Sequence, residues 1–196
     1  MHSNTVKIAD TKYPVLDLIK NRWSARSFSD VAIDEKDLYT LIEAASWMFS
    51  ANNEQPWRFI VAPRGTIAFS QVMQSLVPGN LLWAKNAAAF IVSIANTVFE
   101  KEGHPANNWA EHDLGAANAA LILQATSMNI FAHPLAGFSA AAIKDSFGLN
   151  DHLKPVTVIA LGYLDDAEKL EEPLKSREQA PRKRKPLAEL ILNHSN

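Results

Sequence analysis

The 196-residue sequence contains no cysteine, which excludes disulfide bonds, thiolate metal sites and cysteine nucleophiles. The N-terminal sequence MHSNTVKIAD has no apolar segment of the kind found in secretory signal peptides. The most apolar run, residues 87–95, is far shorter than the roughly 20 residues that a membrane-spanning helix needs. We therefore expect a cytoplasmic protein with no membrane partner, in keeping with a reducing compartment.

Several ligand-binding motifs are also missing. The sequence has no GxGxxG or GxxxxGK[ST] loop for a nucleotide phosphate, no HExxH for zinc and no GxSxG elbow for a serine nucleophile. His112 and Asp113 are adjacent and should point apart on a helix, so we expect no metal site. The formal net charge of −2 argues against general binding to nucleic acid.

What is present indicates one globular α+β domain over residues 1–196, with 1–13 as an N-terminal extension and 164–196 as a C-terminal tail. Hydrophobic residues make up 47% and charged residues 20% of a chain long enough to bury a sizeable core. Helices and strands alternate without a strict βαβ order, which favours α+β over a doubly wound sheet.

Hydrophobic periodicity predicts the elements of this domain. Helices are expected at 14–21, from Asp34 onward, at 66–76, at 109–128 and at 140–147 before a Gly148 cap. Strands are expected at 57–62, 87–95 and 156–161, a short strand followed by a Pro/Gly turn within 130–138, loops at 49–56 and 97–108, and a turn at Pro78-Gly79. The alanine-rich 109–128 helix is apolar on nearly every face, which is typical of a domain centre or a subunit interface.

Arg22, Ser24 and Arg26 are spaced two residues apart. On an extended backbone their side chains point the same way. Two guanidinium groups and a hydroxyl make a suitable phosphate clamp, because the arginine fork matches phosphate oxygens. A solvated charged turn is the alternative for this motif taken alone.

The segment SANNEQPW, residues 50–57, contains two amide side chains before a proline. Pro56 is expected to hold Gln55 in an extended conformation, so that Asn53 and Gln55 project to the same side. Their amides offer donors and acceptors to a flat heterocycle such as a flavin. The alternative is an ordinary polar loop that enters a strand.

A further segment combines proline and glycine in a turn. In HPLAGF, residues 133–138, proline and glycine can bring the backbone close to a planar ligand, although a plain turn is the alternative.

The basic run 182–185 is a solvated tail or a nucleic-acid contact. Five acids within 165–172 would repel a nucleic-acid backbone, and we expect them to balance the basic run instead. The apolar 186–192 suggests a tail that crosses onto a partner chain, or else a loose solvated end.

Taken together and in this order, these segments resemble the nitroreductase family of FMN-dependent flavoproteins. The matching segments span roughly Pro14 to Leu190: RWSARSF, SANNEQPWRFIV, HDLGAANAALILQAT, HPLAGF, VIALGY and RKRKPLAEL. The resemblance implies an α+β fold whose central, mostly antiparallel sheet is flanked by helices. It also implies an intertwined homodimer with a C-terminal tail crossing to the partner, and two FMN sites each built from both chains.

Carried over position by position, the resemblance implies a set of FMN-binding residues. The phosphate and ribityl chain would be held at Arg22, Trp23, Ser24 and Arg26, joined by Arg182 and Arg184. The isoalloxazine would be faced by Ser50, Asn53 and Gln55, and contacted by Pro134, Leu135, Ala136 and Gly137. Phe49 stands where the family often has proline. Ala136 stands where many members have glutamate, so contact there would be through the backbone.

The implied activity is hydride transfer from NADH or NADPH through FMN to a small-molecule electron acceptor: a nitroaromatic, a quinone or another conjugated compound. No catalytic side chain is expected, because the cofactor performs the chemistry. One alternative is a flavin-storage or flavin-sensing protein without general reductase activity. A less favoured alternative is nucleic-acid binding through the basic tail.

Overall fold

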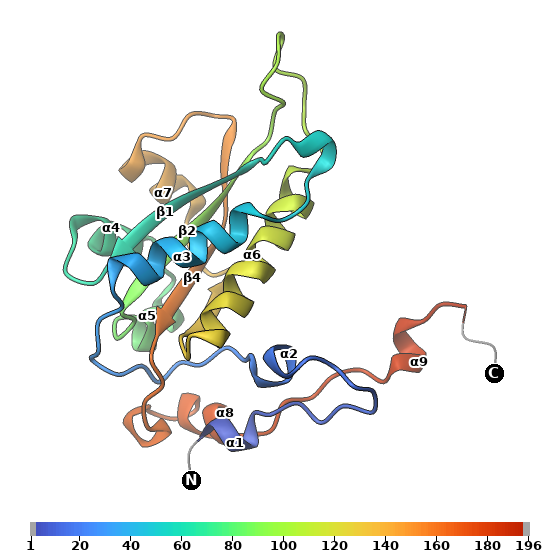
Figure 1. The fold of residues 1–196 in the computed structure, drawn as a ribbon. Coiled ribbons are helices and arrows are strands. Elements are labelled where there is room, and N and C mark those ends of the chain that lie inside the picture. Colours follow the sequence, from blue (N-terminus) through green and yellow to red (C-terminus); the bar gives the residue numbers. More distant parts are fainter. Residues whose placement is uncertain (1–2, 194–196) are drawn as a thin grey trace.

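The computed structural model describes residues 3–193 and contains one central sheet (Figure 1). Its strand order is β1-β2-β4-β3, and every neighbouring pair is antiparallel. The strands are β1 (Trp57–Pro63), β2 (Ala89–Asn96), β3 (Phe131–Leu135) and β4 (Leu153–Gly162). The α+β class and the antiparallel sheet expected from the sequence are confirmed.

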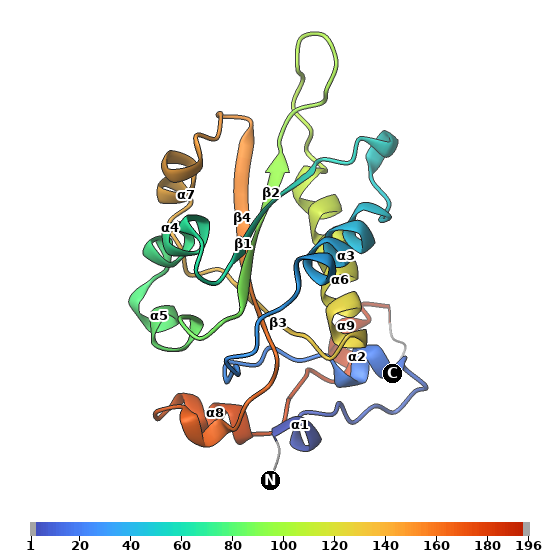
Figure 2. The same ribbon diagram turned by 60° about the vertical axis from the view of Figure 1, so that its left-hand side comes forward.

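Helices cover both faces of the sheet (Figure 2). One face carries α3 (Glu35–Ser46) and α6 (Ala110–Ser127), and the other carries α4 (Ile67–Ser75), α5 (Pro78–Ala84) and α7 (Ala140–Phe147). Strand β2 is buried along its whole length because its alternate residues enter different cores. Phe90 and Val92 join the core on the α4 and α7 side, whereas Ile91 and Ala95 join the core beneath α3 and α6.

Local sequence signals account for several boundaries. The Thr66 and Ser139 hydroxyls accept the N–H groups of Phe69 and Ala142, both at 3.1 Å, and so cap α4 and α7. Gly148 adopts the left-handed conformation expected of it after α7. The expectation of a turn at Pro78-Gly79 is wrong: these residues begin α5, where Pro78 occupies the first helical turn and needs no N–H partner.

The predicted helix at 14–21 is shorter in the structure, and the short strand predicted within 130–138 is confirmed by β3. The remaining short elements are α1 (Ser3–Val6), α2 (Asp17–Asn21), η1 (Ala51–Asn53), η2 (Ala167–Lys169), α8 (Leu174–Gln179) and α9 (Leu187–Leu190). Among the described residues, no helix combines the length and apolarity needed to cross a bilayer.

The N-terminal segment with α1 and the helix α8 lie side by side below the sheet (Figure 1). The Lys7 ammonium donates to the carbonyls of Arg177 at 2.7 Å and Ala180 at 2.5 Å, which fastens the N-terminal segment to the end of α8. Beyond Arg182 the chain runs away from the body of the domain towards α9. Leu190 and Ile191 there are 58% and 43% exposed.

Candidate functional site

The segment 22–28 forms an extended chain whose side chains alternate in burial. Trp23 and Ala25 are buried, while Arg22, Ser24 and Arg26 are partly exposed on the other side. The Arg22 guanidinium donates to the Ser24 hydroxyl at 3.4 Å. The shared direction expected for the three polar residues therefore matches their burial in the structure.

Trp23 belongs to the core. Its side chain is 3% exposed, packs edge-on against Phe131 and donates from the indole to the Asn4 side chain at 3.2 Å. These contacts leave only the Trp23 backbone to face a cofactor.

The arginines of the tail lie close to Arg22. Burial and the neighbouring Arg184 lower the pKa of Arg22, and burial followed by Arg22 and Arg184 lowers the pKa of Arg182. No ion pair within residues 3–193 joins Arg22 or Arg184 to a carboxylate. This concentration of uncompensated positive charge attracts an anion such as a phosphate.

Arg182 is engaged differently from the phosphate ligand that the resemblance implies. Its guanidinium donates to the main-chain carbonyls of Lys20 and Arg22, at the end of α2. Arg184, by contrast, is exposed, and its guanidinium donates only to the neighbouring Lys183 carbonyl among the described residues. Arg184 is thus free to bind a ligand, whereas Arg182 connects the tail to α2.

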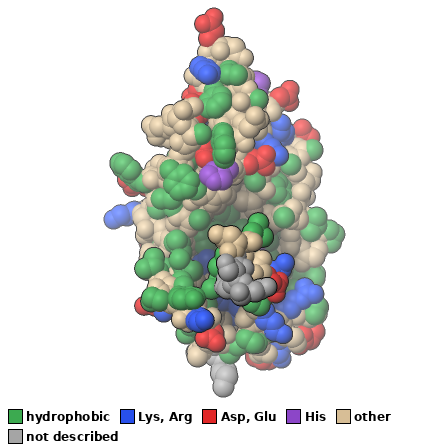
Figure 3. Space-filling view, turned by 90° about the vertical axis from the view of Figure 1, so that its right-hand side faces the viewer, with side chains coloured by type: hydrophobic (Ala, Val, Ile, Leu, Met, Phe, Trp, Pro, Cys, Tyr) green, Lys and Arg blue, Asp and Glu red, His purple; other side chains and the backbone are tan. Residues whose placement is uncertain are grey.

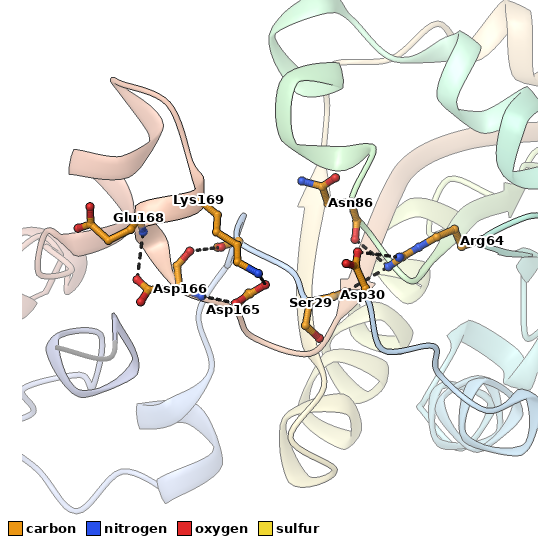
Figure 4. A network of polar contacts seen from close by, with 9 residues as sticks. Ser29, Asp30, Arg64, Asn86, Asp165, Asp166, Glu168 and Lys169 are labelled. Atoms are coloured by element: carbon orange, nitrogen blue, oxygen red, sulfur yellow. Dashed lines mark hydrogen bonds and ion pairs between the residues drawn. The ribbon is translucent and has the colours of Figure 1, made fainter.

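The acids of residues 165–172 do not neutralise the basic run 182–185, contrary to our expectation. Figure 4 shows Lys169 bound to Asp165, at 2.6 Å, and Lys175 forms an ion pair with Glu168. No ion pair in the described part of the chain links the two runs. Asp165 and Glu168 are paired locally, because Lys169 lies four residues after Asp165 and Lys175 of α8 lies against Glu168.

Glu178 of α8 is a site residue that sequence reasoning missed. Its carboxylate is fully buried and accepts the N–H groups of Arg26 at 2.8 Å and Ser27 at 3.0 Å. Its second oxygen lies 3.8 Å from the Arg26 guanidinium. No local pattern marks this residue, since its partners are more than 150 positions away in the sequence.

His133 lies beneath the same segment. Its Nδ1 is 2.9 Å from the Ala25 carbonyl, and its ring packs against Trp83 at an interplanar angle of 33°, with centroids 4.5 Å apart. Burial, with a further contribution from Arg26 and Arg22, lowers the pKa of His133 to about 4. The imidazole is therefore neutral near pH 7, and its Nδ1–H donates to Ala25.

We call residues 134–137 the contact loop. Pro134 and Ala136 are exposed, whereas the Leu135 side chain is 3% exposed and packs in the core. The Gly137 carbonyl accepts the N–H of Val77 at 3.1 Å and the side-chain amide of Asn80 at 3.0 Å. The loop therefore lies against the start of α5, on the same side of the molecule as His133.

We call residues 50–55 the amide loop. The extended conformation expected for Gln55 is wrong: Gln55 has φ 51°, and Asn52 and Asn53 both have φ 56°. The Ser50 hydroxyl accepts the Gln55 N–H at 2.9 Å, and the Gln55 side chain donates to the Asn53 carbonyl at 3.1 Å. These bonds hold a tight left-handed turn that the preference before Pro56 does not override.

Asp113, at the start of α6, anchors the amide loop. One oxygen of its buried carboxylate accepts the Ala51 N–H at 2.9 Å, and the other lies 2.9 Å from Nδ1 of His112. The expectation that His112 and Asp113 point apart is wrong, because the two oxygens of the Asp113 carboxylate contact different groups: one the Ala51 N–H and the other the His112 ring. Within residues 3–193, no cluster of three or more potential ligands could hold a metal.

The two halves of the predicted site lie at opposite ends of α6 (Figure 1). Asp113 holds the amide loop at the beginning of the helix, whereas Thr126, near its end, lines a small pocket with Arg22. At 1.5 Å rise per residue, these ends are about 20 Å apart. A single chain therefore does not bring the amide loop onto the arginines.

A groove of about 1040 Å³ opens beside Arg22, between residues 9–19 and the tail. Its walls include Ile19 and Ile191, and its basic edge includes Arg22 and Arg184. Figure 3 shows this face of the molecule hollowed, with hydrophobic side chains around the hollow. A phosphate group fits the basic edge, and the exposed backbone of the contact loop fits a planar ring, so the residues present suit FMN.

Comparison with known proteins identifies the family. The model of the nitroreductase family matches residues 19–163. An uncharacterised 15.4 kDa protein of Mycolicibacterium smegmatis is 35% identical over 135 residues, covering 65% of this chain and 88% of that protein. A putative NADH dehydrogenase/NAD(P)H nitroreductase of Archaeoglobus fulgidus is 30% identical over 155 residues, covering 77% and 86%.

Solved structures extend the likeness to nearly the whole chain. A crystal structure described as an oxidoreductase containing FMN superposes with a TM-score of 0.90 at 31% identity, covering 95% of this chain and 94% of that one. A putative nitroreductase of Desulfovibrio desulfuricans in complex with FMN has a TM-score of 0.75 at 24% identity, covering 95% and 99%. The second likeness concerns the fold alone.

Proposed function

This chain belongs to the nitroreductase family, and on that premise we propose that it is an FMN-dependent oxidoreductase with NADH or NADPH as electron donor. The second substrate is a small conjugated electron acceptor such as a nitroaromatic or a quinone. Bound FMN would supply the hydride chemistry. The side chains of this protein bind and orient it, and we assign no catalytic side chain.

The observation that carries this proposal is the arginine cluster beside the extended 22–28 segment. Arg22 and Arg184 have no carboxylate partner among the described residues, and Ser24 offers a hydroxyl beside Arg22. We propose that these three residues, with Arg26, hold the FMN phosphate and ribityl chain. Charge-assisted bonds from guanidinium to phosphate are stronger than neutral hydrogen bonds, so this end of the site supplies most of the affinity.

We further propose that the contact loop lies against the flavin ring and that the amide loop of a second copy completes the site. The separation of the two halves along α6 supports a shared site. The exposed apolar residues of the tail also support a shared site, because burying exposed apolar surface against a second chain is favourable. A homodimer with two-fold symmetry would give both copies the same site.

Purification and anaerobic titration test the proposal. The protein should be yellow, should release FMN on denaturation, and should lose its flavin absorbance when NADH or NADPH is added without oxygen. A yellow protein that neither donor bleaches would instead be a flavin-storage or flavin-sensing protein. A colourless protein that FMN cannot reconstitute would overturn the proposal.

A further inference from the structure

One side chain fastens the contact loop to α5. Asn80 donates its side-chain amide to the Gly137 carbonyl at 3.0 Å, while the Val77 N–H donates to the same oxygen at 3.1 Å. The packing is tight: a Cβ added to Gly137 would lie 2.7 Å from the Asn80 amide nitrogen and 2.8 Å from a Val77 methyl group. The carbonyl thus has both acceptor positions used and a fixed direction.

This fastening determines how the neighbouring peptide groups are presented. The Phe138 N–H turns back to the Ala136 carbonyl at 3.2 Å, so the loop closes tightly around Gly137. The N–H groups of Ala136 and Gly137 donate to no protein acceptor within residues 3–193. Ala136 is exposed, so these two donors remain available to a ligand in a defined orientation.

We propose that Asn80 is a positioning residue for the flavin ring, acting through Gly137. It holds the Ala136 and Gly137 amides where they donate to the bound ring and favour its reduced form over its oxidised form. The reduced ring carries more negative charge, so aligned N–H dipoles stabilise it more. This inference rests on the proposed function, because it concerns the ring that the contact loop would meet.

A purely structural brace would have a different effect. If Asn80 only stiffened the loop, its loss would weaken the binding of oxidised and reduced FMN equally and leave the midpoint potential of the bound flavin unchanged. If Asn80 orients the two N–H donors, its loss weakens the binding of reduced FMN more than that of oxidised FMN. The ratio of the two affinities, which the midpoint potential reports, therefore separates the two roles.

The test uses Asn80→Leu, which keeps the side-chain size and removes the donor without adding charge. We expect oxidised FMN to bind within about threefold of wild type, and the affinity for reduced FMN to fall about tenfold more than the affinity for oxidised FMN. For a two-electron couple, that difference lowers the midpoint potential by about 30 mV. Gly137→Ala, whose methyl group would push Asn80 and Val77 away, should lower it as well.

Asn86→Leu is the matched control, because Asn86 is exposed and engages Arg64 only through its main-chain carbonyl (Figure 4). It should leave the potential unchanged. If Asn80→Leu does not fold, Asn80→Ala and Gly137→Ala provide the same measurement. A wild-type protein that binds and reduces FMN, with variants at the wild-type potential, would overturn this inference alone. A wild-type protein without flavin would instead overturn the proposed function.

Discussion

The Glu178 carboxylate accepts the backbone N–H of Arg26 at 2.8 Å, which connects helix α8 to the extended 22–28 segment. Burial raises the pKa of Glu178, and the amides of Arg26 and Ser27 oppose that rise, as do the charges of Arg26 and Lys7. The carboxylate has no exposed surface, so these groups take the place of its hydration. The tail and the segment that presents Arg22 and Arg26 consequently form one unit.

Replacing Glu178 with alanine should lower the free energy of unfolding by about 3 kcal/mol, because two amides and the Arg26 guanidinium lose a buried partner. Urea denaturation of the apo protein measures this loss. Glu189→Ala, in exposed α9, is the control and should stay within about 0.5 kcal/mol of wild type. Equal stabilities for the two variants would show that the Glu178 contacts contribute nothing.

His133 should make the apo protein less stable as the pH falls from 7 to 5. Its pKa is depressed from 6.5 to about 4 in the folded state. Between these pH values the unfolded chain binds a proton at His133 and the folded chain does not. The free energy of unfolding therefore falls progressively as the pH drops from 6.5 towards 4. Between pH 7 and 5 the loss should be about 2 kcal/mol.

His133→Asn can still donate to Ala25 but does not titrate, so it isolates this effect. The variant should show a pH-dependent loss smaller than that of wild type by about that amount, measured by urea unfolding at both pH values. Parallel pH profiles for the two proteins would contradict a neutral, buried His133.

Arg184 and Arg182 should respond in opposite ways to alanine substitution. Arg184→Ala should weaken FMN binding by about 1–3 kcal/mol and leave apo stability near wild type, because its guanidinium is exposed. Arg182→Ala should lower apo stability by about 1–3 kcal/mol, because the carbonyls of Lys20 and Arg22 lose their donor.

Arg22→Ala should behave like Arg184→Ala in FMN binding. Fluorescence titration with FMN and thermal unfolding of the apo protein give the two measurements for each variant. Wild-type FMN affinity in both Arg22→Ala and Arg184→Ala would remove the phosphate assignment.

Leu190→Asp should convert the proposed dimer to monomer. Burying a leucine is worth about 1.5–3 kcal/mol, and two-fold symmetry counts each loss twice, so dissociation should rise more than a hundredfold. Sedimentation equilibrium measures it, and flavin should be lost together with the dimer if the site is shared. Ile67→Asp, at an 81% exposed position on α4, should leave the assembly unchanged. A stable, FMN-bound monomer would rule out the shared site.

Local sequence was enough for most helices and strands and for the common direction of Arg22, Ser24 and Arg26. Period-two alternation follows from backbone geometry, and burial of Trp23 and Ala25 on the opposite side fixes which face is free. The Gly148 cap was equally accessible, since a glycine acts directly at its own helix end. The order of the motifs along the chain was sufficient to indicate the family.

Only the tertiary structure decided which polar groups are free to bind a ligand. Arg182 and Arg184 are nearly identical in sequence context, yet one is tied to α2 and the other is exposed. Glu178 and Arg26 lie more than 150 positions apart, so no local pattern announces their contact. Hydrogen-bonding capacity is a property of a residue, but its availability depends on partners that the fold brings from distant parts of the chain.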